Sequence, residues 1–309
     1  MFCCIICKGT EADIRSVRDA KDGASISIAL CSTCGHVQLA NVPSTQTLEA
    51  FYRTEYRRAY RRADAPKPKH VYRAGSNASA RISLILPHVD KGTRLLDIGA
   101  GGGEFVYLAA RSGLHAQGID PASGYLEFAR ENYGVELRGV GVDELEAEER
   151  YGLVTLFHVL EHLPDPVGAI ATIADHLEPD GLLYLEVPDL CAKDTSPTNL
   201  WFKAHISYFT PLTLALLVTP HFEVLQTHSG RVLEMILRKR PAPIAVPDLS
   251  SARNAAVELS RQRMAGKTFG EYLANGGMTA IFRSAARALR EYRQTGNRSA
   301  KEVLDAFLP

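Results

Sequence analysis

The chain has 309 residues and a mass of 33.8 kDa, which fits one large globular domain with appendages or two smaller domains. Hydrophobic residues make up 46% and charged residues 23%, so the chain has enough apolar material for a core and is not disordered throughout. Lys and Arg together number 35, as do Asp and Glu, and the formal net charge of zero gives no sign of a polyanionic partner.

The sequence predicts neither a membrane span nor an export signal. No uninterrupted apolar run reaches the roughly 18 residues typical of a transmembrane helix. The segment Met1–Lys8 is too short for the apolar region of a signal peptide, and no charged segment precedes it. We therefore expect a cytoplasmic protein without a membrane partner.

Residues 1–45 are predicted to form a zinc ribbon. Four of the six cysteines form two pairs with two residues inside each pair: Cys4 and Cys7, then Cys31 and Cys34. Each pair presents two thiolates from one tight turn to a tetrahedral Zn²⁺ ion, and the closed site then has a structural role. Cys3 could replace Cys4, but it leaves three residues before Cys7, so Cys4 is preferred. The alternative is four unrelated cysteines.

Residues 46–75 are predicted to form a basic and aromatic helical linker. Positions 51–73 hold eight basic and two acidic residues, and tyrosines recur every four residues over Tyr52–Tyr60, which places them on one helical face. The helix either packs these tyrosines on the main domain or acts as a lid over a phosphate-bearing substrate, such as a nucleotide-linked sugar or RNA. The prolines up to Pro68 are expected to end this helix, and a domain boundary is expected near Gly75.

Residues 76–240 alternate apolar strands with helices, which predicts an α/β fold with a doubly wound, mostly parallel sheet covered on both faces. Helices are expected at 105–110 and 125–133. Only Ser229–Arg231 join the last two strands, so these strands must pair as an antiparallel hairpin. The seven expected strands are residues 93–99, 115–120, 135–140, 153–158, 182–187, 222–228 and 232–237.

The first of these strands leads into a glycine-rich loop whose spacing indicates the class of cofactor. The order is Asp97-x-Gly99-x-Gly101-x-Gly103, whereas a dinucleotide fingerprint counted from Gly99 requires glycine at the position of Glu104. These glycines let the backbone approach a flat ligand without forming a pyrophosphate cradle. Asp120, at the end of the second strand, is placed to accept hydrogen bonds from two ribose hydroxyls.

These residues resemble the class I methyltransferases that use S-adenosylmethionine. The run Asp97–Gly103 looks like their first motif, and Phe157–Pro166 looks like the segment after their fourth strand. The resemblance covers roughly residues 80–240. Together with the cysteine pairs, the run His205–Thr210 makes the chain similar to sugar methyltransferases of deoxysugar pathways, including the 3-C-methyltransferases.

The resemblance implies S-adenosylmethionine as the cofactor and a role for each matched residue. Asp97 would support the loop, Asp143 would lie near the adenine, and His158 would line the methyl-donor pocket. His205 would match the catalytic base of the family. The implied cofactor-binding residues are Asp97, Gly99, Ala100, Gly101, Asp120, Asp143 and His158.

A hydroxyl acceptor must lose its proton during methyl transfer, and we expect His205 to be the general base, with His158 or His162 as second choices. The sugar C-methyltransferases carry Tyr-His-Glu-His where this chain has Phe202–His205, so transfer to oxygen or nitrogen is favoured over transfer to carbon. Glu161 and His162 are expected to start a helix and pack a loop. The alternative, a metal site at His158 and His162, is disfavoured because the segment lies at a strand end.

Residues 241–309 predict a linker at Pro241–Pro243 followed by helices at 252–264 and 278–292. This extension contains no catalytic constellation. It either closes over the substrate or mediates self-association into an oligomer.

The predicted function is methyl transfer to a small hydroxylated metabolite, a sugar or a nucleotide-sugar. One alternative is an RNA methyltransferase that uses the zinc ribbon and the basic linker, but the zero net charge counts against a nucleic-acid partner. The other alternative is a scaffold that binds the cofactor without catalysis.

Overall fold

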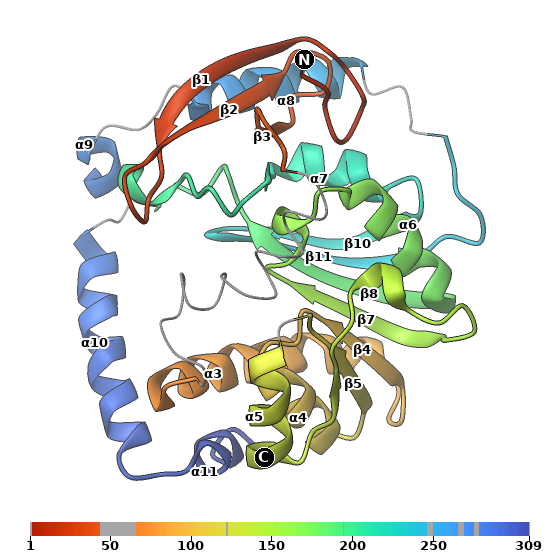
Figure 1. Cartoon of the computed structure of the whole chain (residues 1–309), viewed down its shortest axis with the longest axis vertical. Coiled ribbons are helices and arrows are strands. Elements are labelled where there is room, and N and C mark those ends of the chain that lie inside the picture. The colour runs from red at the N-terminus through yellow and green to blue at the C-terminus, as the bar shows by residue number, and fades with distance from the viewer. Residues whose placement is uncertain are drawn as a thin grey trace. The chain divides into compact units, whose positions relative to one another are not determined.

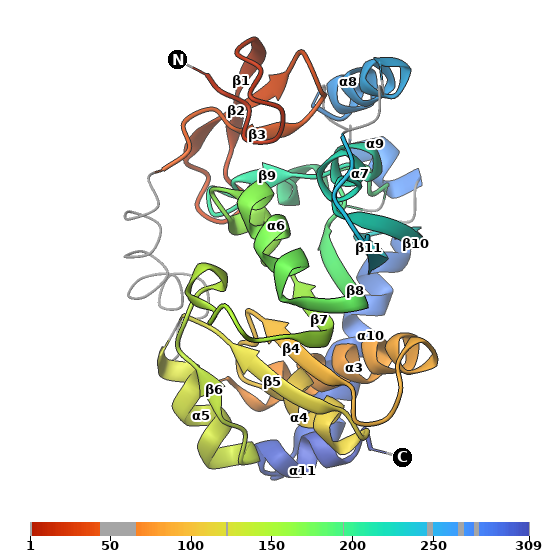
Figure 2. The ribbon, with the colours of Figure 1, turned by 90° about the vertical axis from the view of Figure 1, so that its right-hand side faces the viewer.

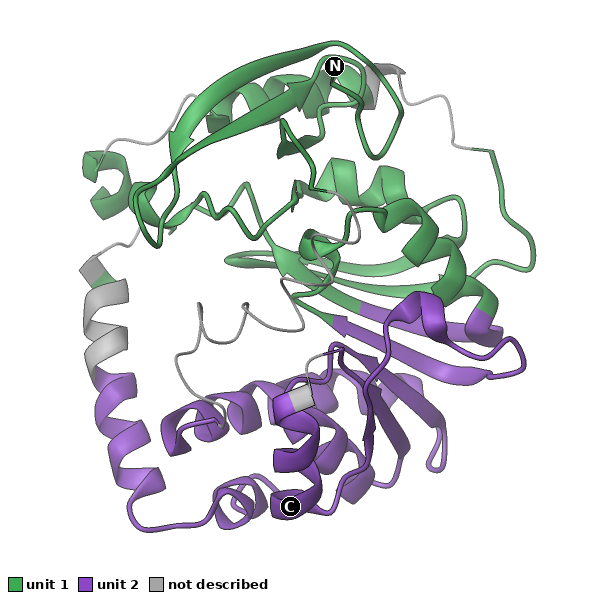
Figure 3. Cartoon of the chain, viewed as in Figure 1, with its two compact units in different colours: residues 1–44, 157–175, 185–282 green, residues 45–156, 176–184, 283–309 purple. Residues whose placement is uncertain are grey.

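The computed structural model describes residues 2–43, 66–121, 123–193, 195–245, 250–264, 269–274 and 278–308. The chain divides into two compact units (Figure 3). The first unit comprises residues 1–44, 157–175 and 185–282, and the second comprises 45–156, 176–184 and 283–309. The predicted tyrosine-bearing helix of the linker lies outside the described residues.

A parallel sheet forms the centre of the second unit. Strand β4 pairs with β5 and with β7, and β5 pairs with β6, all in parallel. The central strands β4 and β7 are mostly buried and mostly apolar, as Leu95 and Leu96 are in β4. The bounds are β4 (Arg94–Ile98), β5 (His115–Ile119), β6 (Leu137–Arg138) and β7 (Tyr151–Phe157).

The complete sheet has seven strands in the order β10-β11-β8-β7-β4-β5-β6. The remaining strands are β8 (Leu177–Pro188), β10 (Phe222–Ser229) and β11 (Val232–Lys239). Strands β10 and β11 pair antiparallel, as the short connection predicts. The prediction of a seven-stranded, mostly parallel sheet with an antiparallel strand is therefore confirmed.

Helix α3 begins at one of the linker prolines. Pro68 begins α3 (Pro68–Ile85), because the fixed φ of proline suits the first helical position, where no amide donor is needed. Residues 44–65, which hold the predicted tyrosine-bearing helix, lie outside the described residues, so the prediction that the prolines end that helix stays a prediction. Helix α3 continues through Gly75, where a boundary is expected. A Cβ atom on Gly75 would lie 2.7 Å from Leu304 and 2.8 Å from Phe307, so this glycine permits close helix packing.

The other helices of the second unit include α4 (Glu104–Arg111), α5 (Ser123–Tyr133) and α11 (Ala300–Asp305). Helix α3 packs against α4 and α11 (Figure 1 and Figure 2). Short 3-10 helices are η1 (Leu86–His88) and η2 (Val142–Glu144). Helix α10 (Met278–Thr295) contributes Glu291, which accepts hydrogen bonds from Arg73 of α3.

The first unit contains an antiparallel sheet in the order β1-β2-β3-β9. The bounds are β1 (Ala12–Arg18), β2 (Ser25–Cys31), β3 (Val37–Leu39) and β9 (Ser207–Tyr208). Strand β9 comes from the run His205–Thr210, so a distant part of the chain completes the sheet of the N-terminal residues. Its buried cluster consists of Ile28, Leu30, Val37, Leu39, Leu190, Trp201, Tyr208 and Met264.

The helices of the first unit pack around these strands. Helix α8 contacts β2 and α7. The bounds are α6 (Pro166–His176), α7 (Pro211–Val218), α8 (Ser250–Met264) and α9 (Phe269–Tyr272), with 3-10 helices η3 (Leu160–His162) and η4 (Pro197–Asn199). No helix in the described ranges is both long enough and apolar enough to cross a membrane.

Candidate active site and cysteine cluster

The glycine-rich loop in the second unit turns back tightly after β4. The amides of Gly99 and Ala100 both donate to the Ile119 carbonyl, at 2.8 and 3.0 Å. Gly99, Gly101 and Gly103 have φ values of +74°, +57° and +79°, a left-handed conformation that strains residues with a side chain. The glycine spacing in the sequence therefore reflects the backbone that this loop requires.

Two buried aspartates lie at the ends of the strands beside the loop. Asp120 directly follows β5, and its Oδ2 accepts a hydrogen bond from the amide of Gly101 at 2.9 Å. Asp97 lies in β4, where its Oδ1 accepts a hydrogen bond from the Thr155 hydroxyl at 2.7 Å. Asp97 thus links β4 to β7. Asp143 is exposed on η2.

His158 adopts an unusual backbone conformation in the first unit. Its φ is +57°, which is rare for residues other than glycine and marks stored strain that is frequent at functional sites. The His158 amide donates to the Glu186 carbonyl at 2.9 Å, and its Nδ1 lies 3.4 Å from Oε1 of Glu161. The His158 side chain is 42% exposed. This imidazole therefore combines solvent access with a carboxylate partner.

Glu161 is the buried centre of a histidine cluster that we define as His158, Glu161, His162 and His205. Its Oε1 lies 3.9 Å from Nε2 of His162, and its Oε2 has no hydrogen-bond partner among the described residues. Burial acts to raise the pKa of Glu161, but the hydrogen bond from His158 and the charge of His162 outweigh it and lower the pKa to about 2. The carboxylate is therefore ionised.

His205 is packed among rings. Its centroid lies 4.9 Å from that of His162, edge to face, and 5.0 Å from that of Phe202. Burial, followed by the neighbouring His162, lowers the pKa of His205 to about 4. A neutral imidazole with so low a pKa is a weak proton acceptor.

The sequence predicts that Glu161 and His162 start a helix and pack a loop, and both residues lie in the 3-10 helix η3. It does not predict that they also form this cluster. The Ile206 amide donates to the Glu161 carbonyl at 2.7 Å, which ties η3 to the residues before β9. That contact joins segments 45 residues apart in the sequence. The one signal of the histidine cluster in the sequence was the four-residue spacing of His158 and His162.

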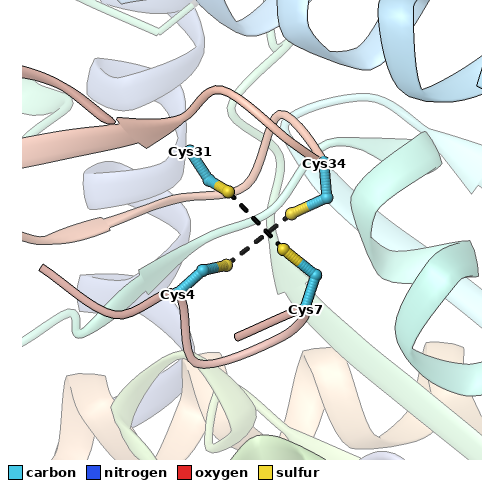
Figure 4. A group of neighbouring side chains, drawn as sticks. All are labelled: Cys4, Cys7, Cys31 and Cys34. Atoms are coloured by element: carbon cyan, nitrogen blue, oxygen red, sulfur yellow. Dashed lines mark hydrogen bonds between the residues drawn. The ribbon is translucent and has the colours of Figure 1, made fainter. Parts of the chain in front are cut away.

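The side chains of the four paired cysteines point toward one another (Figure 4). The Sγ atoms of Cys4 and Cys34 are 3.6 Å apart, and those of Cys7 and Cys31 are 3.5 Å apart. All four sulfur atoms lie within 4.8 Å of one another, and none of the cysteines forms a disulfide. Cys3 is exposed and lies outside this cluster, which contains Cys4.

Comparison with known proteins identifies the region that contains the glycine-rich loop and the histidine cluster. Residues 68–221 match the family model described as a methyltransferase domain. The ubiquinone biosynthesis O-methyltransferase of Bordetella avium (strain 197N) is 37% identical over 101 residues, which is 30% of this chain and 42% of that protein. The enzyme of that name from Xanthomonas campestris pv. campestris (strain B100) is 34% identical over 131 residues, or 40% of this chain and 53% of that protein. The chain thus spans about half the length of the curated relatives it matches.

Solved structures show the same fold. The 1,6-didemethyltoxoflavin-N1-methyltransferase of Burkholderia thailandensis, bound to its substrate and S-adenosylhomocysteine, has a TM-score of 0.51 at 21% identity over 72% of this chain and 99% of that chain. The magnesium protoporphyrin IX methyltransferase of Synechocystis PCC 6803, with bound S-adenosylhomocysteine, has a TM-score of 0.50 at 14% identity over 64% of this chain and 100% of that chain. Residues 68–221 therefore form a class I S-adenosylmethionine-dependent methyltransferase domain.

Proposed function

We propose that the chain transfers a methyl group from S-adenosylmethionine to a hydroxyl oxygen of a small metabolite, with a sugar or nucleotide-sugar as the first acceptor class to test. The observation that carries the proposal is the hydrogen bond from the Gly101 amide to Asp120, because it joins the glycine-rich loop to the carboxylate at the next strand end. The names of the curated relatives favour oxygen as the attacked atom.

The methyl donor is already activated as a sulfonium, so the protein acts chiefly by alignment. Orientation of the nucleophile, methyl carbon and sulfur can contribute about 7–11 kcal/mol to lowering the barrier. Gly99, Ala100 and Gly101 would approach the cofactor through their backbone, and Asp120 would accept hydrogen bonds from its ribose. Asp143 is a further candidate contact for the adenine.

We propose His158 as the general base in preference to His205. His158 is half-exposed, and its Nδ1 lies 3.4 Å from Oε1 of Glu161, which would orient the ring. His205 is more buried, and its pKa is lowered to about 4. His158 is also the second residue after Leu156, which pairs with Ile98 just before the glycine loop. His158 therefore directly follows the carboxyl end of β7, which pairs with the carboxyl end of β4. We favour His158 as the base because the glycine-rich loop also follows β4.

We further propose that Cys4, Cys7, Cys31 and Cys34 hold a structural Zn²⁺ ion. A tetrahedron with Zn–S bonds of about 2.3 Å has edges of about 3.8 Å. The separations of 3.5 and 3.6 Å within the cluster are close to that value. Four thiolates saturate the ion, so the zinc would stabilise β2 and the turns around it and take no part in catalysis.

The proposed activity is tested by incubating the full chain with methyl-labelled S-adenosylmethionine and a panel of nucleotide sugars and phenolic alcohols. We expect an acceptor to gain the mass of one methylene group while S-adenosylhomocysteine forms in equal amount. His158→Ala should lower the rate about 10²–10⁴-fold without changing the affinity for S-adenosylhomocysteine. The matched control is His228→Ala, an exposed histidine of β10, which should retain the full rate.

Two outcomes would contradict this proposal. Cofactor binding without methyl transfer to any acceptor would indicate a scaffold. Transfer to RNA that collapses between low and moderate salt would indicate a nucleic-acid substrate instead.

A further inference from the structure

We propose that Glu161, His162 and His205 form a second metal site, separate from the cysteine cluster, for a divalent first-row transition ion such as Zn²⁺ or Fe²⁺. One ligand atom from each residue lies within 4.8 Å of the other two. Two imidazoles and one carboxylate are a donor set that suits these ions, whereas thiolates are absent from this group.

The local fold brings the three ligands together. Glu161 and His162 are neighbours in the 3-10 helix η3, and His205 lies just before β9. The bond from the Ile206 amide to the Glu161 carbonyl fixes the two segments against each other. All of these residues belong to the first unit, so the site is complete within it.

The orientation of His162 is typical of a metal ligand. Its Nδ1 lies 2.8 Å from the carbonyl oxygen of Ala204, and because a carbonyl can only accept, Nδ1 carries the proton. Histidines that bind metals usually donate their second ring N–H in this way to a backbone carbonyl. Nε2, the nitrogen left to bind an ion, is the atom directed at Glu161.

Glu161 supplies a second, independent observation. Its side chain is only 2% exposed, and its Oε2 has no hydrogen-bond partner among the described residues. A buried carboxylate oxygen without a partner is costly, and a bound cation would offset that cost. The 3.9 Å between Oε1 and Nε2 of His162 is too long for a hydrogen bond, so no direct bond between these atoms takes the place of an ion.

Three protein ligands leave at least one coordination position open, unlike the four thiolates of the cysteine cluster. If the proposed function is correct, an acceptor hydroxyl at that position would release its proton more easily. His158, which contacts Glu161, would then receive the proton. This consequence rests on the proposed function, whereas metal binding by the three ligands does not.

The site is tested by stripping the full chain of metal, reducing it, and titrating it with Co²⁺ without oxygen. Cobalt bound by thiolates has intense near-ultraviolet charge-transfer absorption, whereas cobalt bound by imidazole and carboxylate has only weak visible absorption. We expect the wild type to bind one equivalent of the second kind. Glu161→Gln and His205→Ala should each lose that equivalent and keep any thiolate-bound cobalt, and the exposed control His228→Ala should keep both.

Fluorescence of the single tryptophan, Trp201, checks that each variant folds, because this residue lies in the core of the same unit. His162→Gln is a further variant with the same expected loss. Cobalt that all three ligand variants retain would be adventitious and would overturn the proposal, as would a wild type that binds only thiolate-bound cobalt. Calorimetry with S-adenosylhomocysteine separates the two proposals, because loss of this metal site should leave cofactor binding intact.

Discussion

Replacing Gly35 by alanine should disrupt the packing of α8 against the cysteine-bearing residues. Gly35 directly follows Cys34 and has a φ of +74°. A Cβ atom at this position would lie 2.5 Å from the backbone carbon of Ala256 and the backbone nitrogen of Val257, which belong to α8. Since backbone atoms cannot rotate away, either the helix or the turn must move.

Three costs contribute to the loss of stability. An alanine in the left-handed conformation costs about 1–2 kcal/mol, and overpacking typically costs about 1–3 kcal/mol. Movement of α8 also breaks the buried bond from the Ser260 hydroxyl to the Gly35 carbonyl, which is 2.7 Å long and worth about 0.5–1.5 kcal/mol. We expect Gly35→Ala to lower the free energy of unfolding by about 3–6 kcal/mol.

Gly23→Ala is the matched control. Gly23 has a φ of +72°, but a Cβ atom there would meet nothing within 4 Å. It should therefore lose only the conformational part, about 1–2 kcal/mol. Urea unfolding followed by Trp201 fluorescence measures both variants. Equal shifts of the two unfolding midpoints would refute the packing of α8 against Gly35.

Three further changes probe other parts of the molecule. Asp120→Ala removes the carboxylate that accepts the hydrogen bond from the Gly101 amide. Loss of this charge-assisted bond, worth about 1.5–3 kcal/mol, should weaken the binding of S-adenosylhomocysteine about tenfold to a hundredfold in calorimetry. An unchanged affinity would contradict this role of Asp120. Hydrogen bonds from Arg73 lower the pKa of Glu291, so its stabilising effect is present above the unfolded pKa of about 4.3 and is lost as pH falls through the folded value. The difference in unfolding free energy between the wild type and Glu291→Gln should therefore shrink below about pH 4 in urea unfolding, and a constant difference would contradict it. A strong chelator should release one zinc from the cysteine cluster and lower the Trp201 unfolding midpoint, whereas an unchanged midpoint would argue against a structural zinc.

The parts of the structure that could be predicted from sequence depend on neighbouring residues. Strand β4, the glycine loop and α4 follow one another directly, so apolar runs and glycine spacing were enough to locate them. The β10–β11 hairpin was predictable for the same reason, because its connection is too short for any other pairing.

The features that escaped prediction depend on contacts between distant segments. Strand β9 has two residues, too few for a periodic pattern, and it pairs with Val37 and Gln38 of the distant strand β3. The histidine cluster depends on the contact between Glu161 and Ile206 in the same way. From the sequence alone, Gly75 suggests the end of a helix. In the fold it lies within α3 and leaves room for the side chain of Leu304.

The central claim is that the loop with Gly101 and the carboxylate of Asp120 bind S-adenosylmethionine. Isothermal titration of the full chain with S-adenosylhomocysteine tests it most directly, with NAD titrated in parallel. We predict saturable heat corresponding to one molecule of S-adenosylhomocysteine per chain and none with NAD. Saturable binding of NAD, with no heat from S-adenosylhomocysteine, would contradict it.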